Sequence, residues 1–356
     1  MNLDERDIVG RYHVLEPIGH GTMGTVYLGH DPFHDRPVAL KIAHQPPYRN
    51  RATTDLYKTL FINEMRADGM LTHPNIIEVL DAGTDGDRYY IAMEYIDGGR
   101  TLDHWCAGGR LLPLERVAEV VLKCAQALDY AHRKGVIHRD VKPSNVLVSR
   151  SGEIKLADFS VALLTDSKID ETQLLDLVGS PAYMSPEQLC DESITHQSDL
   201  FSLGNMLYEL LTGRLPFAAE TVAGVTHKVL NLEPPPVSRW RDDVPESLER
   251  IVRRALARNL VDRYANALEM AAELSMAFSG LHDPLATRAV EGRVDALKRL
   301  NFFAEFRDAE IWELLRWAQW REFAAGETLV TEGTDDDTVY VLVDGTVDVS
   351  KGGKAV

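Results

Sequence analysis

The chain has 356 residues, of which 45% are hydrophobic and 26% are charged. This length fits two to three folded units, and the composition differs from that of disordered, collagen-like or disulfide-rich proteins. Its 38 basic and 55 acidic side chains give a formal net charge of -17. Because such a charge repels a phosphate backbone, nucleic-acid partners are disfavoured.

The cysteines and the apolar runs bear on the compartment. Cys106, Cys124 and Cys190 have no metal-type spacing and fit reduced thiols. The first residues, MNLDERDIVG, do not resemble a secretory signal, and no uninterrupted apolar run reaches about 18 residues. We therefore expect a cytoplasmic protein with no membrane span.

From Tyr12 to Ile96 the sequence favours short strands separated by Gly, Pro and Asp. The strand-like runs are YHVLEPIG, TVYLGHD, PVALKIA and YYIAMEYI. Between the third and fourth of these, residues 53–71 allow one helix, which His73 and Pro74 end. The pattern predicts a small sheet with one helix.

The period then changes to that of helices. Apolar residues at helical spacing predict helices over 114–128, 203–211 and 248–256, the second ended by Gly213. Between the first two, NVLV and EIKLAD, joined around Ser151 and Gly152, predict a hairpin beside the helices. A helical lobe is expected to follow the sheet lobe, with this hairpin at their junction.

A separate region is predicted from about Leu281. Its amphipathic helices are followed by strand-like TVYVLV and TVDVS, joined at Asp344 and Gly345, which suit a type I′ turn. The apolar helix residues are Leu297, Leu300, Phe303, Ile311, Leu314 and Leu315.

Two features of the first lobe suggest phosphate binding. GHGTMGTV, residues 19–26, places glycines where backbone amides can approach phosphate oxygens. Lys41 lies on an apolar strand, where an ammonium group needs an anionic partner. Each is weak alone, because Gly-rich turns usually only make hairpins and most lysines lie on solvated faces.

The segment HRDVKPSN, residues 138–145, is much more specific. Its five fixed positions would arise by chance in about one such chain in ten thousand. Asp140 can accept a hydroxyl proton, Lys142 can neutralise a transferring phosphoryl group, and Asn145 can offer a hard oxygen to magnesium. Asp158, which follows the EIKL strand, offers a second oxygen ligand.

With these segments the sequence resembles the eukaryotic-type protein kinases, and specifically their bacterial serine/threonine members. The resemblance covers residues 12–278 and implies a bilobal α+β fold, with a β-rich N-lobe over 12–96 and a helical C-lobe over 97–278. It matches Gly19, Gly21 and Gly24 to the loop over the ATP phosphates, and Lys41 and Glu64 to the pair that aligns ATP.

The resemblance also implies an adenine pocket. Ile18, Val26, Ala39 and Leu147 would enclose the base, although each alone could be ordinary lobe core. Met93 would guard the back of the pocket, and the backbone of Glu94 and Ile96 would hydrogen-bond adenine.

Serine/threonine specificity is implied by GSPAYMSPE, residues 179–187, which resembles the segment that presents the acceptor peptide. Ser180 stands where the family usually has Thr, Glu187 would pair with Arg263, and Asp199 would support the catalytic-loop backbone. The resemblance therefore implies transfer of the ATP γ-phosphoryl group, with Mg²⁺, to Ser/Thr hydroxyls of protein substrates.

Two positions qualify the match. Ser160 replaces the glycine of the usual DFG, and its Cβ restricts how the segment can rearrange. Arg139 should seek an anion in the activation segment, and we hypothesise that Asp176 partly replaces a phosphate there; the alternative is a solvated acidic residue. Rival phosphorylation sites are Thr165, Ser167 and Thr172.

The end of the chain is similar to the opening half of a cyclic nucleotide-binding domain. We expect a helical linker over 279–299 and a partial β-roll over 300–356, which lacks the phosphate cassette of that family. Either the chain is a fragment, which we favour, or the piece is a degenerate dimerisation element. Cyclic nucleotide binding is expected only in a longer chain. The alternative to an enzyme is a pseudokinase or nucleotide-binding scaffold, which Ser160 and this segment favour.

Overall fold

The computed structural model describes residues 8–21, 24–44, 70–106, 111–159, 163–164, 181–190 and 192–282, with short stretches between 293 and 355. The chain divides into two units, Met1–Leu281 and His282–Val356, and each is considered by itself. Several predicted features lie outside the described residues: most of the helix over 53–71 with Glu64, and Ser160, Thr165, Ser167, Thr172, Asp176 and Ser180.

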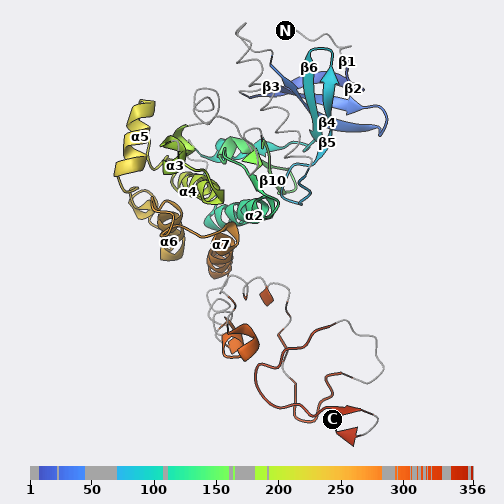
Figure 1. The fold of residues 1–356 in the computed structure, drawn as a ribbon, viewed down its shortest axis with the longest axis vertical. Coiled ribbons are helices and arrows are strands. Elements are labelled where there is room, and N and C mark those ends of the chain that lie inside the picture. The colour runs from blue at the N-terminus through green and yellow to red at the C-terminus, as the bar shows by residue number, and fades with distance from the viewer. Residues whose placement is uncertain are drawn as a thin grey trace. The chain divides into compact units, whose positions relative to one another are not determined.

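A six-stranded antiparallel sheet forms the first lobe, in the order β1-β2-β3-β4-β6-β5. Its strands are β1 (Ile8–Val9), β2 (Tyr12–His20), β3 (Gly24–Asp31), β4 (Arg36–Ala43), β5 (Val79–Asp85) and β6 (Arg88–Glu94). The four predicted strands are confirmed as β2, β3, β4 and β6, whereas β1 and β5 were not predicted. Figure 1 shows the sheet gathered at one end of this unit.

Alternation of side chains gives this sheet its core. Tyr12 and Val14 are buried while His13 between them is exposed, as expected for a half-buried strand. They pack in one cluster with Val38, Leu40 and Ile42 of β4. The residues between those, Ala39 and Lys41, therefore point to the opposite face of β4.

Helices form the second lobe. They are α2 (Leu114–Arg133), α3 (Pro186–Leu189), α4 (His196–Thr212), α5 (Val222–Asn231), α6 (Glu246–Ala255) and α7 (Ala267–His282). The helices predicted around 114–128, 203–211 and 248–256 are confirmed as α2, α4 and α6. Gly213 ends α4 with a φ of 71°, which a glycine adopts without strain.

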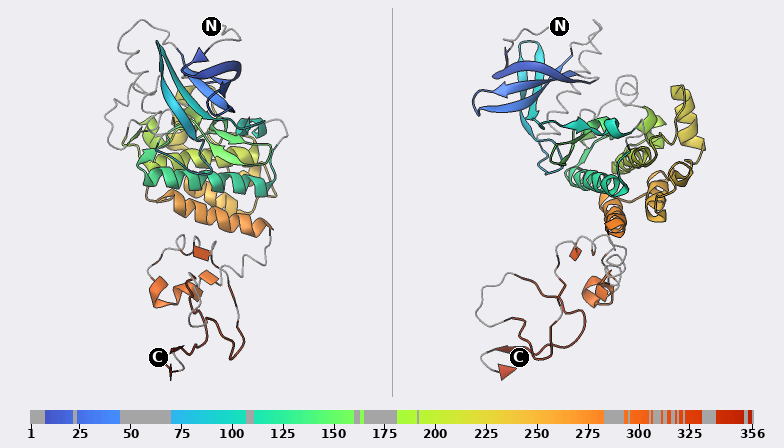
Figure 2. Two further views of the ribbon diagram at one scale, coloured as in Figure 1. Left: turned by 90° about the vertical axis from the view of Figure 1, so that its right-hand side faces the viewer. Right: turned by 180° about the vertical axis from the view of Figure 1, so that it is seen from behind.

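Helix α4 lies at the centre of this lobe, with all but three of its residues buried and with α2 and α6 packed against it. The contact with α6 depends on Gly204, where a Cβ would lie 2.7 Å from Ala255 Cβ. Figure 2 shows α7 lying alongside α2. These helices form a rigid base for the loops that carry the site.

A small sheet joins the lobes. The predicted hairpin is confirmed as β9 (Val146–Val148) and β10 (Ile154–Leu156), with Gly152 in the turn at a φ of 89°. Strand β7 (Arg100–Thr101) pairs with β9, and β8 (Val136–Ile137) pairs separately with β11 (Leu163–Leu164). The hairpin places the residues on both sides of it, Asn145 and Ala157, next to each other.

In the second unit the predicted hairpin is wrong. Residues 338–349 form no strand, and the described strands are β12 (Ser350–Lys351) and β13 (Lys354–Ala355), which pair with each other. The side chains of Val339, Val341, Val347 and Val349 are 45–87% exposed, because no other described strand covers them. An isolated hairpin is marginal in water, which explains why local alternation was not enough. Helical structure is present as η6 (Asn301–Phe303).

In the part of the chain that the structure describes, no helix combines the length and apolar character needed to cross a membrane.

Candidate active site

The predicted base, Asp140, is held in a tight cluster at the end of the loop that follows β8. Its side chain is buried, and its Oδ2 atom lies 2.6 Å from Lys142 Nζ. Asn145 Nδ2 donates to the Asp140 carbonyl at 2.8 Å and to Oδ2 at 3.2 Å. The three residues predicted from one short segment are therefore brought together, and both side-chain contacts use Oδ2 of Asp140.

Asp199 on α4 fixes the backbone of this loop. Its two carboxylate oxygens accept hydrogen bonds from His138 N at 2.8 Å and Arg139 N at 2.7 Å. Arg139 has a φ of 69°, a strained conformation that such bonds can maintain. The predicted supporting role of Asp199 is confirmed.

His132 on α2 adds a third donor to Asp199, with Nε2 at 2.7 Å from Oδ2. Burial alone would raise the pKa of Asp199, but the hydrogen bonds from His132 and the His138 backbone outweigh it and lower the pKa. Asp199 therefore stays a carboxylate inside the lobe. The sequence gives no indication of His132, because the contact joins two helices far apart in the chain.

Lys41 and Asp158 meet across the lobes. Lys41 Nζ on β4 lies 2.6 Å from Asp158 Oδ1, although the lysine side chain is only 7% exposed. Asp158 has a φ of 67°, and the backbone beside it is tied to the catalytic loop because Ala157 N donates to Asn145 O at 2.8 Å. Lys41 thus has the anionic partner that its position requires.

Strand register places the N-lobe part of the predicted adenine pocket on one face of the sheet. Val26 stands opposite Lys41, and Met93 stands opposite Ala39. Because directly opposed residues share a face, as do Ala39 and Lys41 along β4, all four point to the same side. Ile18 on β2 is exposed and Leu147 on β9 is half-buried, so neither belongs to the main core.

The segment after β6 has its own backbone contacts. Glu94 N donates to Glu78 O at 2.9 Å, and Glu94 stands opposite Val38 of β4. Ile96 O accepts from Gly99 N at 3.0 Å. Among the described residues no acceptor is bonded to Ile96 N, so Ile96 would offer a donor to a ligand.

Asn145 and Asp158 carry oxygen atoms of the kind that could ligate a metal ion. The Asn145 amide nitrogen is committed to Asp140, so its carboxamide oxygen faces elsewhere. An amide oxygen and a carboxylate are hard oxygen ligands of the type Mg²⁺ takes, with water and phosphate completing the shell. Within the described ranges, no group of three or more His, Cys, Asp or Glu is placed to hold a metal by itself. The donor set therefore fits Mg²⁺ brought with a phosphate.

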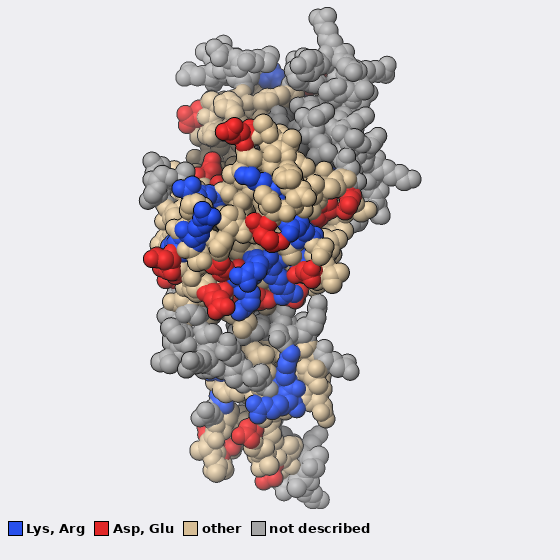
Figure 3. Space-filling model, turned by 90° about the vertical axis from the view of Figure 1, so that its left-hand side faces the viewer, with Lys and Arg blue, Asp and Glu red and all other residues tan. Residues whose placement is uncertain are grey.

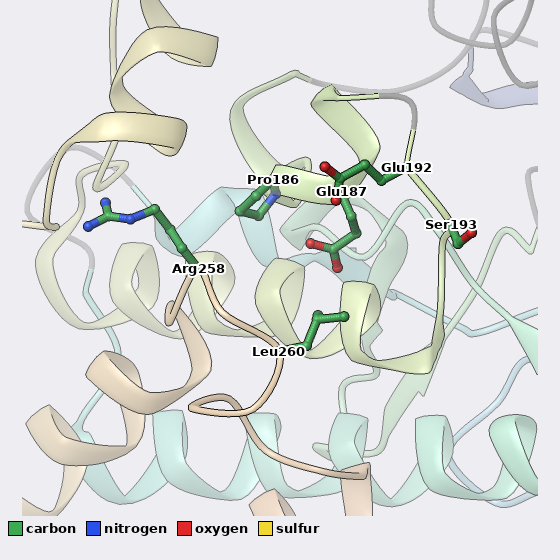
Figure 4. Close-up of a pocket in the computed structure, with 6 residues that line it drawn as sticks. All are labelled: Pro186, Glu187, Glu192, Ser193, Arg258 and Leu260. Atoms are coloured by element: carbon green, nitrogen blue, oxygen red, sulfur yellow. The ribbon is translucent and has the colours of Figure 1, made fainter.

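The predicted pair of Glu187 and Arg263 is confirmed. Arg263 Nη1 lies 2.8 Å from Glu187 Oε1, and both side chains are buried. Figure 4 shows a pocket that Glu187 lines, in which the Arg258 side chain points away from Glu192 and Ser193. The pocket includes no residue of the cluster around Asp140, so it is not part of the predicted site.

Charged side chains of both signs are visible on the described surface. Figure 3 shows Lys and Arg side chains interspersed with Asp and Glu on one face of the molecule.

The comparison with known proteins agrees with the arrangement of these residues. The protein kinase domain family matches residues 12–274. This chain belongs to the protein kinase family. Its kinase domain is similar to those of bacterial serine/threonine-protein kinases.

Relatives agree on this class. The chain is 38% identical over 272 residues to serine/threonine-protein kinase PrkC of Bacillus subtilis, covering 76% of this chain and 41% of the relative. It is 36% identical over 275 residues to serine/threonine-protein kinase PknB of Mycolicibacterium smegmatis, covering 76% and 43%. PknB of Mycobacterium tuberculosis is 33% identical over 328 residues, covering 86% and 52%. The chain thus spans about half or less of the relatives' length.

Proposed function

We propose that this kinase transfers the γ-phosphoryl group of ATP to Ser/Thr hydroxyls of protein substrates. The observation that supports it is the convergence of the catalytic loop with Lys41 and Asp158, through the contacts Asp140 to Lys142 and Asn145, and Lys41 to Asp158. A pseudokinase would be expected to lack one of these groups or to scatter them.

Asp140 is the residue we assign as the base. Lys142 and Asn145 occupy Oδ2, so Oδ1 accepts the proton of the substrate hydroxyl. The hydroxyl oxygen forms a bond to the γ-phosphorus while the bond from that phosphorus to the β–γ bridging oxygen breaks, giving a phosphoester and ADP. The proton passes from Asp140 to solvent after product release.

Lysines stabilise the charge that moves in this step. Lys142, beside the base, is placed to neutralise the transferring phosphoryl group, and Lys41 to hold the α- and β-phosphates. Backbone amides around Gly19, Gly21 and Gly24 would cover the phosphates, since these glycines place no side chain between backbone and ligand. Glu64 stays the predicted partner of Lys41.

When bound, magnesium would neutralise phosphate charge and stabilise the negative charge that develops on the leaving oxygen. Asn145 and Asp158 are the residues we assign to hold it. Asn145 is positioned for this by its bonds to Asp140, and Asp158 by the neighbouring bond from Ala157 N to Asn145 O.

Adenine is proposed to lie against Val26, Ala39 and Met93, with Ile18 and Leu147 at its edges. The shared sheet face supports this placement, and the carbonyl of Glu94 with the N–H of Ile96 would hydrogen-bond the base. Partly exposed apolar side chains are typical of pockets that bury a planar ligand.

The test is phosphoryl transfer by the purified chain. With γ-labelled ATP, Mg²⁺ and a mixed protein substrate, we expect label on serine and threonine and none on tyrosine, and chelation with EDTA should abolish it. Nucleotide binding without label in any protein would favour the scaffold.

Two finer proposals rest on sequence. Asp176 would partly replace a phosphate against Arg139; if so, phosphatase-treated Asp176→Ala should lose turnover relative to the treated parent chain. Residues 300–356 would belong to a cyclic nucleotide-binding domain that regulates the kinase. Activation by cyclic nucleotide in a chain extended beyond residue 356, but not in this one, would test it.

A further inference from the structure

Glu94 and Lys155 form an ion pair between the strand that leads to the adenine site and the strand that leads to the metal site. Lys155 Nζ lies 2.6 Å from Glu94 Oε1, and the two side chains are 14% and 25% exposed. We propose that Lys155 is a positioning residue, which with Glu94 couples the adenine half of the nucleotide site to its phosphate half. This inference rests on the proposed function.

The two residues belong to different halves of the site. Glu94 ends β6 and begins the segment whose backbone is assigned to adenine. Lys155 is the middle residue of β10, which continues through Ala157 into Asp158. Adenine contacts the 94–96 backbone and, through Leu147, the strand paired with Lys155, whereas ATP with its metal also requires Asp158 beyond the end of β10.

The same carboxylate oxygen has a second donor. Glu78 N donates to Glu94 Oε1 at 2.8 Å, and Glu94 N returns a bond to Glu78 O at 2.9 Å. Glu94 therefore holds the residues before β5 with one bond and β10 with the other. Two donors on one oxygen leave that side chain little rotational freedom.

The residues before β5 are themselves bonded to β10. Leu156 N donates to Asn75 O at 2.8 Å, and Ile77 N donates to Leu156 O at 2.9 Å. Asn75 Nδ2 adds a bond to Ile154 O at 2.9 Å. These hydrogen bonds between residues 75–77 and β10 form a seam. The ion pair of Glu94 and Lys155 lies at the end of the seam nearest the adenine segment, so it limits how far β6 can move from β10.

Loss of the pair should make the nucleotide site less preorganised for ATP. If the pair is removed, the seam at 75–77 still joins the lobes, so folding should persist. The separation between the 94–96 backbone and Asp158 becomes less fixed, and ATP must order it on binding. Binding of Mg²⁺·ATP should therefore weaken more than binding of adenosine, which does not reach Asp158.

Dissociation constants for Mg²⁺·ATP and for adenosine, measured calorimetrically on the full chain, provide the test. Lys155→Met keeps the aliphatic stem, and Glu94→Gln keeps the acceptor for Glu78 N while removing the charge. We expect each to raise the Mg²⁺·ATP constant about fivefold and the adenosine constant less than about twofold. Lys155→Arg should restore the parent value to within about twofold, and the double variant should be no weaker than either single variant.

Asp243→Asn is the matched control, because it removes a 2.9 Å ion pair with Arg241 that touches no residue of the site. It should alter neither constant. Equal shifts for both ligands, or an unchanged Mg²⁺·ATP constant in Lys155→Met, would overturn the coupling role. If the parent chain binds nucleotide and transfers phosphate, but the variants keep the parent's ratio of Mg²⁺·ATP to adenosine dissociation constants, only this inference is refuted. If the parent chain binds neither Mg²⁺·ATP nor adenosine, both this inference and the proposed function are refuted.

Discussion

Lys41 Nζ and Asp158 Oδ1 lie 2.6 Å apart, which joins the N-lobe sheet to the strand that leaves the catalytic hairpin. Removing the lysine leaves Asp158 without this cation and the phosphates without a ligand. Lys41→Met should therefore lower kcat/KM for ATP by about 100-fold or more. Steady-state kinetics would measure it, with Lys228→Met on α5 as a control expected to retain full activity.

The buried pair of Arg263 and Glu187 should dominate the stability of its region. Arg263→Met leaves the Glu187 carboxylate buried without its partner, which should cost about 3–5 kcal/mol of unfolding free energy. Arg241→Met, whose partner Asp243 is 60% exposed, should cost less than about 1 kcal/mol. Urea unfolding of both variants gives the comparison, and equal losses would contradict it.

Acid sensitivity should show the contribution of Asp31. Burial raises the pKa of this carboxyl, but hydrogen bonds from His34 and Phe33 N outweigh burial and lower it to about 2. The folded pKa lies below the unfolded value of about 3.9, so the stabilisation is complete above pH 4 and is lost as the pH falls toward 2. The difference in urea midpoint between the parent chain and Asp31→Asn should stay constant from pH 7 to about pH 5 and shrink only below about pH 4. Shrinkage that begins near neutral pH would contradict this.

Thiol labelling should separate the three cysteines. Burial raises the pKa of Cys106 and of Cys124 to about 12, so neither is a thiolate near neutral pH, whereas Cys190 is exposed. A disulfide reagent at about pH 8 should modify one thiol quickly in the folded chain and all three after denaturation. Rapid reaction of Cys124 in the native protein would show that α2 opens more readily than its packing indicates.

How far the sequence predicts this molecule depends on how local each feature is. The roles of Asp140, Lys142 and Asn145 could be predicted because one short loop holds all three. Strand β2 could be predicted because Tyr12 and Val14 alternate with polar residues. Strand β5 was missed because its run VLDAGTD lacks alternation and depends on pairing with β6, whose Tyr90 ring lies against Gly83 of β5.

Long-range contacts could not be predicted in the same way. The pairs His132 with Asp199 and Lys155 with Glu94 join residues far apart in the chain, and no spacing indicates them. The hairpin predicted over 338–349 is the opposite case, because it was predicted but does not form. Its local pattern is that of strands, but strands need partners that cover their apolar face.

The central claim is that Asp140 takes the hydroxyl proton during phosphoryl transfer, and Asp140→Asn tests it most directly. The variant keeps the size of the side chain and an oxygen for the contacts with Lys142 and Asn145, but it lacks the basic carboxylate. Measured with γ-labelled ATP and protein substrate, its turnover should fall by about 100-fold or more while Mg²⁺·ATP binding stays close to that of the parent chain. Equal labelling by the two proteins would contradict the account.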